Sequence, residues 1–492
     1  GLLIGAGAAG VGAAAIATGL LVTTGHVHLQ LPGLSQSVPA APHGQIQQLL
    51  RRAGFGARAS DVASYSALGY AGAVDRLLDP TSVTDDIDAK LQSLALDLTK
   101  VTDMQRWWVM RMIYGKRQLQ EKMTLFWHGL LTSSYQKVGG QTGYPYIVTQ
   151  NNFLRNHAFD SYDNILLGIT QDPAMMWWLD LRLSKKTAPN ENYARELMEL
   201  FTLGVSGGYT QADVHDAARA LTGFSLKRGG TVTYNPAQHD DGAKTLLGHT
   251  GNLDYKDVIH IVAGHPATGP YLCKRLYQFF VGEQPNDADV QTLVGVYTST
   301  GHNMKEVMRA LLHLPTFQAP AAYRARLKSP IEFTIGAIRQ MEVQLNGQGI
   351  ANLMAQMGQT VFAPPSVAGW TGDISSADWL NTGTWLARVN FINALLGGGK
   401  ATNSAAQQAL LQTLQTTLTN NHLATPEDVV GYYVNVLIDG VLSDARRATL
   451  VATLTTPDSG ASLKMAGGKT LSAENLRTML YLLLTSPEYQ LN

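Results

Sequence analysis

The sequence predicts a mainly helical (all-α) fold with one small two-stranded β insert near residues 229–250 and an N-terminal transmembrane helix. Apolar residues recur at three-to-four spacing from Gln45 almost to the end of the chain, which is the period of a helix with one buried face. Two β-prone stretches break this pattern, Gly229–Tyr234 and Lys244–Gly248, and we expect them to pair. The run Gly1–Val22 has no charge and no proline, and a helix of that length, roughly 33 Å, is enough to cross a bilayer.

The N-terminal run is the first element of the chain. It is rich in Ala and Gly and only mildly hydrophobic, which is typical of the twin-arginine signals that export folded proteins. A cleavage site near Val38–Ala41 is the alternative to an uncleaved anchor, and we favour the anchor. Gly5–Gly10 also fits a dinucleotide-binding loop, but that loop needs an acidic residue about 20 positions later. The first acidic residue is Asp61, so the sequence predicts no dinucleotide.

The chain is predicted to divide into four parts. Residues 1–25 form the membrane anchor or export signal, and residues 26–44 form a proline-containing linker that stands off the membrane. Residues 45–396 form the main helical domain and residues 397–492 a C-terminal helical subdomain, with a hinge at Gly397–Lys400. In these parts we expect helices over residues 45–53, 60–78, 84–99, 102–133, 160–169, 190–203, 211–222, 255–263, 270–281, 287–299, 303–313, 331–343, 379–396, 405–418, 426–441, 444–453 and 474–486.

The charge composition excludes one class of partner. Lys plus Arg number 37 and Asp plus Glu number 37, so the formal net charge is +0 and the basic excess of a nucleic-acid-binding protein is missing. Only 15% of residues are charged, against about 25% in a typical soluble domain. Such a composition suits an exported protein, or one that covers part of its surface with partners. The single cysteine, Cys273, excludes an intrachain disulfide and a Cys-based metal site.

The densest polar segment is the predicted helix that follows Pro189. Glu196 and Glu199 fall on one face of this helix, three residues apart. Two carboxylates so placed could ligate a metal or carry out acid–base chemistry, and the alternative is a solvated face or an ion-pair network. Arg195 lies four residues after Glu191, so we expect these two side chains to pair. If that pair is buried, Arg195→Ala should lower stability by more than about 2 kcal/mol.

Two further clusters contain histidine. His128 lies in an apolar helical segment, where it is either a core residue or a ligand or general base. His239 and Asp240 lie between the two β-prone stretches, where they could reach a site or form a turn. We expect His128, Glu196, Glu199 and His239 to converge as catalytic residues. The same four residues, together with Asp240, form the predicted ligand set of a divalent metal.

The polar clusters lie within longer motifs that extend from about Arg51 to the C-terminus. These motifs resemble a large bacterial family known as domain of unknown function 1800. They are Phe126–His128, Asp172–Met175, Pro189–Gly204, Tyr209–Thr210, Ala218–Gly223, His239–Asp240 with Lys244, Lys328–Pro330, Pro364–Pro365 with Gly369–Trp370, Trp379–Asn381 and Ser486–Gln490. Phe224 stands where the family usually has Trp, which leaves one aromatic contact open. The resemblance implies an exported, mainly helical protein that often travels with an exported partner, and it supplies no reaction.

Two functions from different classes remain. The first is a metal-dependent enzyme on the extracytoplasmic side of the cytoplasmic membrane, anchored by residues 1–22. The second is an anchored, non-catalytic subunit that docks onto other membrane or exported subunits, which the low charge and the pairs Trp107–Trp108 and Trp177–Trp178 favour. A small-ligand or carbohydrate-binding module is a third alternative. The enzyme needs the polar clusters to meet in space, and the subunit needs a broad uncharged contact surface.

Overall fold

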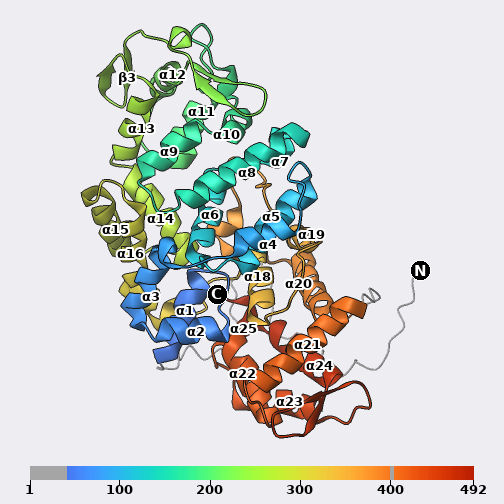
Figure 1. Ribbon diagram of the computed structural model, residues 1–492. Coiled ribbons are helices and arrows are strands. Elements are labelled where there is room, and N and C mark those ends of the chain that lie inside the picture. The colour runs from blue at the N-terminus through green and yellow to red at the C-terminus, as the bar shows by residue number, and fades with distance from the viewer. Residues whose placement is uncertain (1–41, 399–403) are drawn as a thin grey trace.

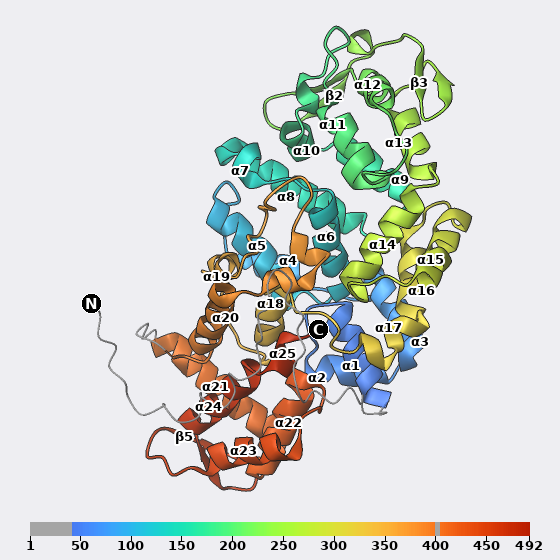
Figure 2. The ribbon, with the colours of Figure 1, turned by 180° about the vertical axis from the view of Figure 1, so that it is seen from behind.

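Helices account for nearly all regular structure in the computed structural model, which describes residues 42–398 and 404–492. Within these residues the sheets are three separate antiparallel two-stranded ones. The mainly helical fold predicted from the sequence is therefore confirmed. The helices form an elongated body (Figures 1 and 2), and one continuous apolar core extends from Ile46 to Tyr489.

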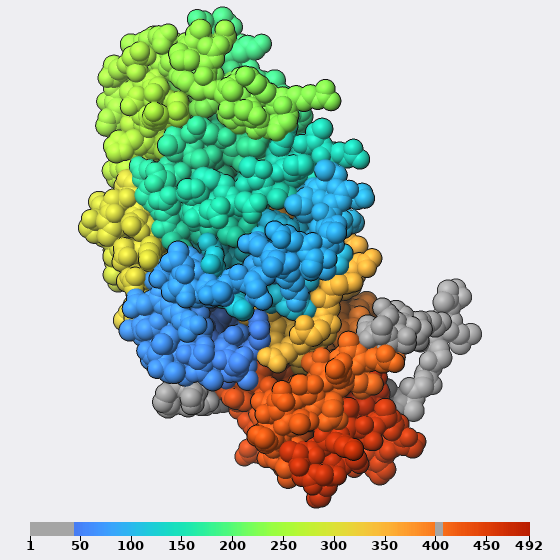
Figure 3. Space-filling model, in the orientation of Figure 1, coloured from blue at the N-terminus to red at the C-terminus, as the bar shows by residue number. Residues whose placement is uncertain are grey.

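The middle of the body combines the N-terminal helices with helices from much later in the chain (Figure 3). Its buried helix α18 packs against α5, α19, α20 and α22. The helices of this part are α1 (Pro42–Arg52), α2 (Ala59–Ser66), α3 (Gly69–Leu78), α4 (Ile87–Ser93), α5 (Val101–Tyr114), α6 (Gln118–Leu130), α7 (Tyr135–Val138), α8 (Gly140–Asn156), α14 (Thr268–Phe280), α15 (Asp287–Ser299), α16 (Met304–His313), α17 (Pro315–Gln318), α18 (Pro330–Gln340), α19 (Ile350–Gln356) and α20 (Thr382–Leu395).

One end of the body, at the top of Figure 1, holds the predicted carboxylates and the strands β1–β4. Its elements are α9 (Tyr162–Thr170), α10 (Pro173–Trp178), α11 (Glu191–Glu196), a π-helix over Leu197–Thr202, α12 (Gln211–Ala220), β1 (Phe224–Leu226), β2 (Val232–Tyr234), β3 (Lys244–Leu246), β4 (His249–Gly251) and α13 (Tyr255–Gly264). Helix α12 packs against both α11 and β3, so it connects the helical and β parts of this end.

The opposite end is built from the last quarter of the chain. It contains α21 (Ser404–Asn420), α22 (Pro426–Ile438), α23 (Asp444–Thr455), β5 (Ser462–Lys464), β6 (Thr470–Ser472), α24 (Ala473–Leu484) and α25 (Pro487–Gln490). After α25 the chain returns to the middle of the body, where the Lys328 amide donates to the Gln490 carbonyl at 2.8 Å and the Asn492 amide donates to the Arg326 carbonyl at 2.6 Å. The predicted division at residue 397 stays a prediction, and part of its glycine hinge lies outside the described residues.

The β insert differs from the predicted one in its pairing. Both β-prone stretches form strands, but β2 pairs with β1, and β3 pairs with β4. A short loop explains the second hairpin, because Leu247 and Gly248 both adopt positive φ, as a two-residue hairpin turn requires. Such local closure costs less chain entropy than joining β2 to β3 across nine intervening residues. The predicted single insert is therefore two adjacent hairpins, and a third, β5–β6, lies near the C-terminus.

Glycine explains where two helix predictions were wrong. The predicted helix over residues 102–133 is two helices, α5 and α6, which part at Gly115. A Cβ atom at Gly115 would lie 2.6 Å from the Arg111 carbonyl oxygen, so only glycine fits there. Helix α8 was not predicted, because Gly140, Gly143 and Pro145 in its first turns hide its period.

The predicted transmembrane helix, residues 1–22, lies outside the described residues, as do the predicted anchor and most of the linker. In the part of the chain that the structure describes, none of the helices is both long enough and apolar enough to cross a bilayer.

Candidate functional site

Glu196 and Glu199, which we call the carboxylate pair, lie where α11 passes into the π-helix. The Asn190 side chain caps the start of α11 by accepting from the Asn192 amide at 2.9 Å. Further along, the Thr202 hydroxyl donates to the Leu197 carbonyl, five residues earlier, at 2.6 Å. Short π-helical turns inside helices are rare and often occur at functional sites.

The two carboxylates have different surroundings. The Tyr209 hydroxyl donates to Glu199 at 3.0 Å, whereas the Glu196 carboxylate makes no hydrogen bond within the described residues. Partial burial, and then the charge of Glu199, raise the pKa of Glu196 above its usual value. Burial, followed by the hydrogen bond to Glu199, raises the pKa of Tyr209 to about 12. The protonated form is thus favoured at Glu196, whereas the distinguishing feature of Glu199 is the hydrogen bond that it accepts from Tyr209.

Arg195 lies on the same helix and pairs with Glu191, as predicted. It donates to Glu191 at 3.1 Å and to the Gln211 side chain at 2.8 Å, and Gln211 also donates to Glu191 at 2.8 Å. These bonds join α11 to the first turn of α12. The Arg195 side chain is 38% exposed, so the network lies at the surface.

His239 and Asp240 form a separate cluster in the loop before β3. The Asp240 carboxylate accepts from the Arg219 guanidinium at 2.7 and 3.2 Å, and this bond lowers the pKa of Asp240 to about 2. His239 is buried, and its Nδ1 lies 3.1 Å from the Thr222 carbonyl. Lys244 donates to the Gly242 carbonyl at 2.9 Å. These contacts fix the loop against the C-terminal end of α12.

His128 lies in α6, inside the middle of the body and away from the β hairpins (Figure 1). Its ring is enclosed by Trp108, Phe362 and Trp370, with ring centroids 5.4, 5.6 and 5.7 Å away. The Nε2 atom is buried and has no hydrogen-bond partner in the described part of the chain. Burial lowers the pKa of His128 to about 3, so the imidazole is neutral.

The structure therefore brings Glu196 next to Glu199 and His239 next to Asp240, and places His128 elsewhere. Over residues 42–398 and 404–492, no three His, Cys, Asp or Glu side chains form a group that could hold a metal ion. The geometry thus does not assemble the predicted five-residue ligand set.

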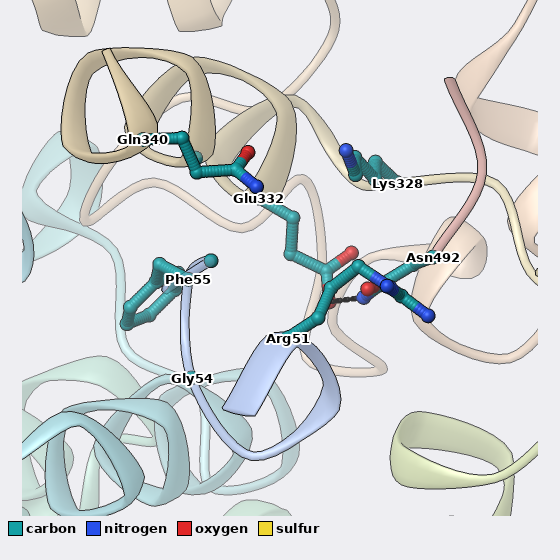
Figure 4. Close-up of a pocket in the computed structure, with 9 residues that line it drawn as sticks. Arg51, Gly54, Phe55, Lys328, Glu332, Gln340 and Asn492 are labelled. Carbon is teal, nitrogen blue, oxygen red and sulfur yellow. Dashed lines mark hydrogen bonds between the residues drawn. The ribbon is translucent and has the colours of Figure 1, made fainter. Parts of the chain in front are cut away.

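A second candidate site was not predicted from the sequence. It is a small pocket lined by Arg51, Gly54–Gly56, Lys328, Glu332, Gly336, Gln340 and Asn492, which we call the cationic pocket (Figure 4). Its lining comes from the end of α1, the loop after it, the segment just before α18, α18 itself and the last residue of the sequence. The charged and amide side chains in this lining are all more than nine-tenths buried: Arg51, Lys328, Glu332, Gln340 and Asn492.

Glu332 is fully engaged inside the pocket wall. It pairs with Lys122, accepts from the Asn492 side chain at 2.8 Å and from the Ser329 amide at 2.7 Å. Burial alone would raise the pKa of Glu332, but Lys122 and then Arg326 outweigh it and hold the pKa at about 2. The sequence signal that could have found this residue is the capping box Ser329-x-x-Glu332, which the structure forms completely.

Comparison with known families fits the motifs quoted above. Residues 48–491 match the family model described as "Protein of unknown function (DUF1800)". The chain belongs to this family. No curated protein and no solved structure matches the chain. The DUF1800 match covers the carboxylate pair, His128, the His239–Asp240 loop and all of the cationic pocket except Asn492. The ring of Phe224 packs edge-on against Tyr234 and Tyr255, so this position makes an aromatic contact.

Proposed function

We propose that the protein is an acid–base enzyme that hydrolyses its substrate at the carboxylate pair. The supporting observation is the difference between the two neighbours: Glu196 has no hydrogen bond in the described residues and a raised pKa, while Glu199 accepts from Tyr209. Glu196 is the proton donor to the leaving group, and Glu199 accepts a proton from the attacking water. Tyr209 orients Glu199 through its hydrogen bond, and it is the one residue of this site that the sequence did not predict.

A divalent metal fits this proposal only with fewer protein ligands than the five that the sequence predicts. Two carboxylates can hold Mg²⁺ or Mn²⁺ when water and substrate oxygens supply the other ligands. His128 is not part of this site, because it is enclosed by aromatic rings in the middle of the body. Metal dependence therefore rests on Glu196 and Glu199 alone.

The test is a survey of hydrolysis by the full chain. Representative esters, glycosides, peptides and phosphoesters are offered to the wild type with and without Mg²⁺ or Mn²⁺. We expect one bond class to be cleaved, and Glu196→Gln and Glu199→Gln to lose about 100-fold or more in rate. Glu191→Gln is the matched control, since Glu191 lies on the same helix in the surface network. The proposed hydrolase would be rejected if none of these substrate classes is cleaved, or if both carboxylate variants keep full activity.

A second function, a non-catalytic subunit that docks on other membrane or exported proteins, is favoured by the surface of α20. Trp385 and Leu386 are adjacent, and their side chains are 37% and 58% exposed. Large apolar side chains exposed together often mark protein interfaces. Cross-linking in native membranes, comparing the wild type with Trp385→Ser and Leu386→Ser, tests this function. Identical cross-linked products in all three would argue against it.

We propose further that the body lies on the extracytoplasmic side of the cytoplasmic membrane, held by residues 1–22. The charge-free apolar run of spanning length supports this placement. Carbonate extraction of membranes should leave the intact chain in the pellet. Release of the intact chain into the supernatant would show that the run does not anchor it.

A further inference from the structure

The cationic pocket contains more buried positive charge than its carboxylates balance. Six basic side chains are at least nine-tenths buried around it, and they interact electrostatically with one another or with Glu332: Arg51, Arg52, Lys122, Arg326, Lys328 and Arg388. Two carboxylates pair with members of this set, Glu332 with Lys122 and Asp439 with Arg51. A third, the buried Asp373, interacts with Arg326 and Lys122, and burial raises its pKa to about 7. Buried charges without partners are costly, so a surplus of cations indicates that something negative belongs there.

Two of these cations line the pocket and have free donors. Arg51 uses Nη1 to bind Asp439, but its Nε and Nη2 are buried and have no partner in the described residues. Lys328 is 3% exposed, and its ammonium lies 3.6 Å from the centre of the Tyr489 ring. Its Nζ makes no hydrogen bond to any part of the chain that the structure describes. Burial, and then the charge of Arg51, lower the pKa of Lys328 well below its usual value, which is the expected sign for a cation that lacks a counter-ion.

The remaining polar side chains of the pocket wall are mostly paired, and the exception in the described residues is the buried Asn492 Oδ1, a single acceptor. The Gln340 amide nitrogen donates to the Val436 carbonyl at 2.6 Å, and the Glu332 carboxylate is held by Lys122, Ser329 and Asn492. The unused hydrogen-bonding capacity around the cavity therefore consists mainly of donors. Donors with positive charge select an anion rather than a cation or a neutral ligand.

The size of the cavity decides which anion fits. The cavity is small, with room for about one molecule of the size of water. A monatomic halide is only slightly larger than a water molecule, whereas sulfate and phosphate carry four oxygens around a central atom. We propose that the cationic pocket is a binding site for a monovalent inorganic anion, chloride in its natural state, held by Arg51 and Lys328.

This site is separate from the carboxylate pair, and the proposal does not depend on the proposed hydrolysis. It joins three distant parts of the chain, since Arg51 lies in the last turn of α1, Lys328 precedes α18, and Asn492 follows α25. A bound anion would stabilise this junction by binding the folded chain and not the unfolded one.

The test measures thermal unfolding of the full chain while chloride replaces gluconate at constant ionic strength. We expect Tm to rise with the logarithm of the chloride concentration above its Kd, by about 3 °C at a hundredfold excess. Bromide should act like chloride. Lys328→Met removes the charge and keeps the length of the stem, and it should abolish this rise. Lys100→Met, a matched change at a side chain that is 65% exposed, should retain it.

A second measurement on the wild type tests the anion site even if Lys328→Met does not fold. Crystals of the wild type grown with bromide should show an anomalous peak in the cationic pocket, next to Lys328 Nζ and the Arg51 guanidinium. Equal Tm values in chloride and gluconate would overturn the proposal, as would a pocket without an anomalous peak. Stronger stabilisation by sulfate that requires Lys328 would also overturn it, because sulfate is too large for the cavity described.

Discussion

The carboxylate pair and the cationic pocket differ in the sign of their charges and in how deeply those charges are buried. At the carboxylate pair, Glu196 and Glu199 are half-buried on one helical segment and partly exposed to solvent. The two carboxylates differ in their hydrogen bonds, because Glu199 accepts one from Tyr209. In the cationic pocket, charges from α1, α6 and α18 meet in the core, where each needs a partner or a bound ion. The first arrangement suits proton transfer to something outside, and the second suits holding an ion within. The expected effects of substitutions should separate the two regions.

The largest effect is expected in the wall of the cationic pocket, at the pair Lys122–Glu332. The two side chains are 0% and 5% exposed, so Lys122→Met leaves Glu332 buried without its main counter-ion. We expect the free energy of unfolding to fall by about 3–5 kcal/mol. Chemical denaturation of the full chain measures it, with Lys100→Met as a surface control that should cost less than about 1 kcal/mol.

A double variant sharpens this prediction. Glu332→Gln removes the negative charge but keeps a side-chain oxygen for the Ser329 amide. Added to Lys122→Met, it should therefore restore part of the lost stability instead of lowering it further. Additive losses in the double variant would show that the two charges do not stabilise each other in the fold.

The next effect concerns His128, a buried group that belongs to neither charged region. Its pKa is about 3 in the folded protein, against an ordinary value of 6.5 for a histidine in water, so only the unfolded chain takes up this proton as pH falls below about 6.5. Stability should therefore fall with acidification, and this residue alone should cost about 2 kcal/mol near pH 5. His128→Gln should remove that share of the pH dependence. His249→Gln, at an exposed position, should leave the wild-type slope unchanged, and an equal slope in all three would contradict the burial of a neutral imidazole.

The sequence predicted what is local and missed what is assembled from distant segments. The helical period, the Glu191–Arg195 pair and the shared face of Glu196 and Glu199 depend on spacings of three or four residues, which a sequence displays directly. The cationic pocket joins Arg51 to Lys328 across most of the chain, and no spacing rule connects them. The hairpins show the same limit, because pairing two β-prone stretches from composition alone ignored the tight turn at Leu247–Gly248.

The predicted metal site also combined polar residues from distant segments, each selected because its local setting is unfavourable for a polar side chain. His128 was chosen because it lies in an apolar helix, but in the structure its ring packs among three aromatic rings, apart from the carboxylate pair, and its buried Nε2 has no partner in the described residues. His239 and Asp240 were chosen because they lie in a loop, and Thr222 and Arg219 hold them there. A polar residue in an apolar pattern therefore indicates that its position is restricted. Only the folded structure shows which neighbouring group restricts it.

A smaller effect is expected at the surface network beside the carboxylate pair. Arg195 and Glu191 are 38% and 32% exposed, so water screens their attraction. The loss of more than about 2 kcal/mol expected for a buried pair should not occur, and Arg195→Ala should cost less than about 1 kcal/mol. A double-mutant cycle with Glu191→Ala measures the coupling between the two side chains. A coupling well above 1 kcal/mol would show that this network is as stabilising as the pocket wall, and would remove the contrast between the regions.

The smallest effect is the mutual influence of Glu196 and Glu199. Burial is the main reason that the pKa of Glu196 is raised, and the negative charge of Glu199 is the second. Glu199→Gln removes that charge and keeps an acceptor for the Tyr209 hydroxyl. The pKa of Glu196 should then fall, since a like charge is removed, and should stay above its usual value because burial remains. Carboxylate carbon NMR of glutamate-labelled protein follows this titration, with Glu191→Gln as the control that leaves the pKa in place. An unchanged pKa in Glu199→Gln would mean that the two carboxylates titrate independently, and the division into proton donor and proton acceptor would lose its electrostatic basis.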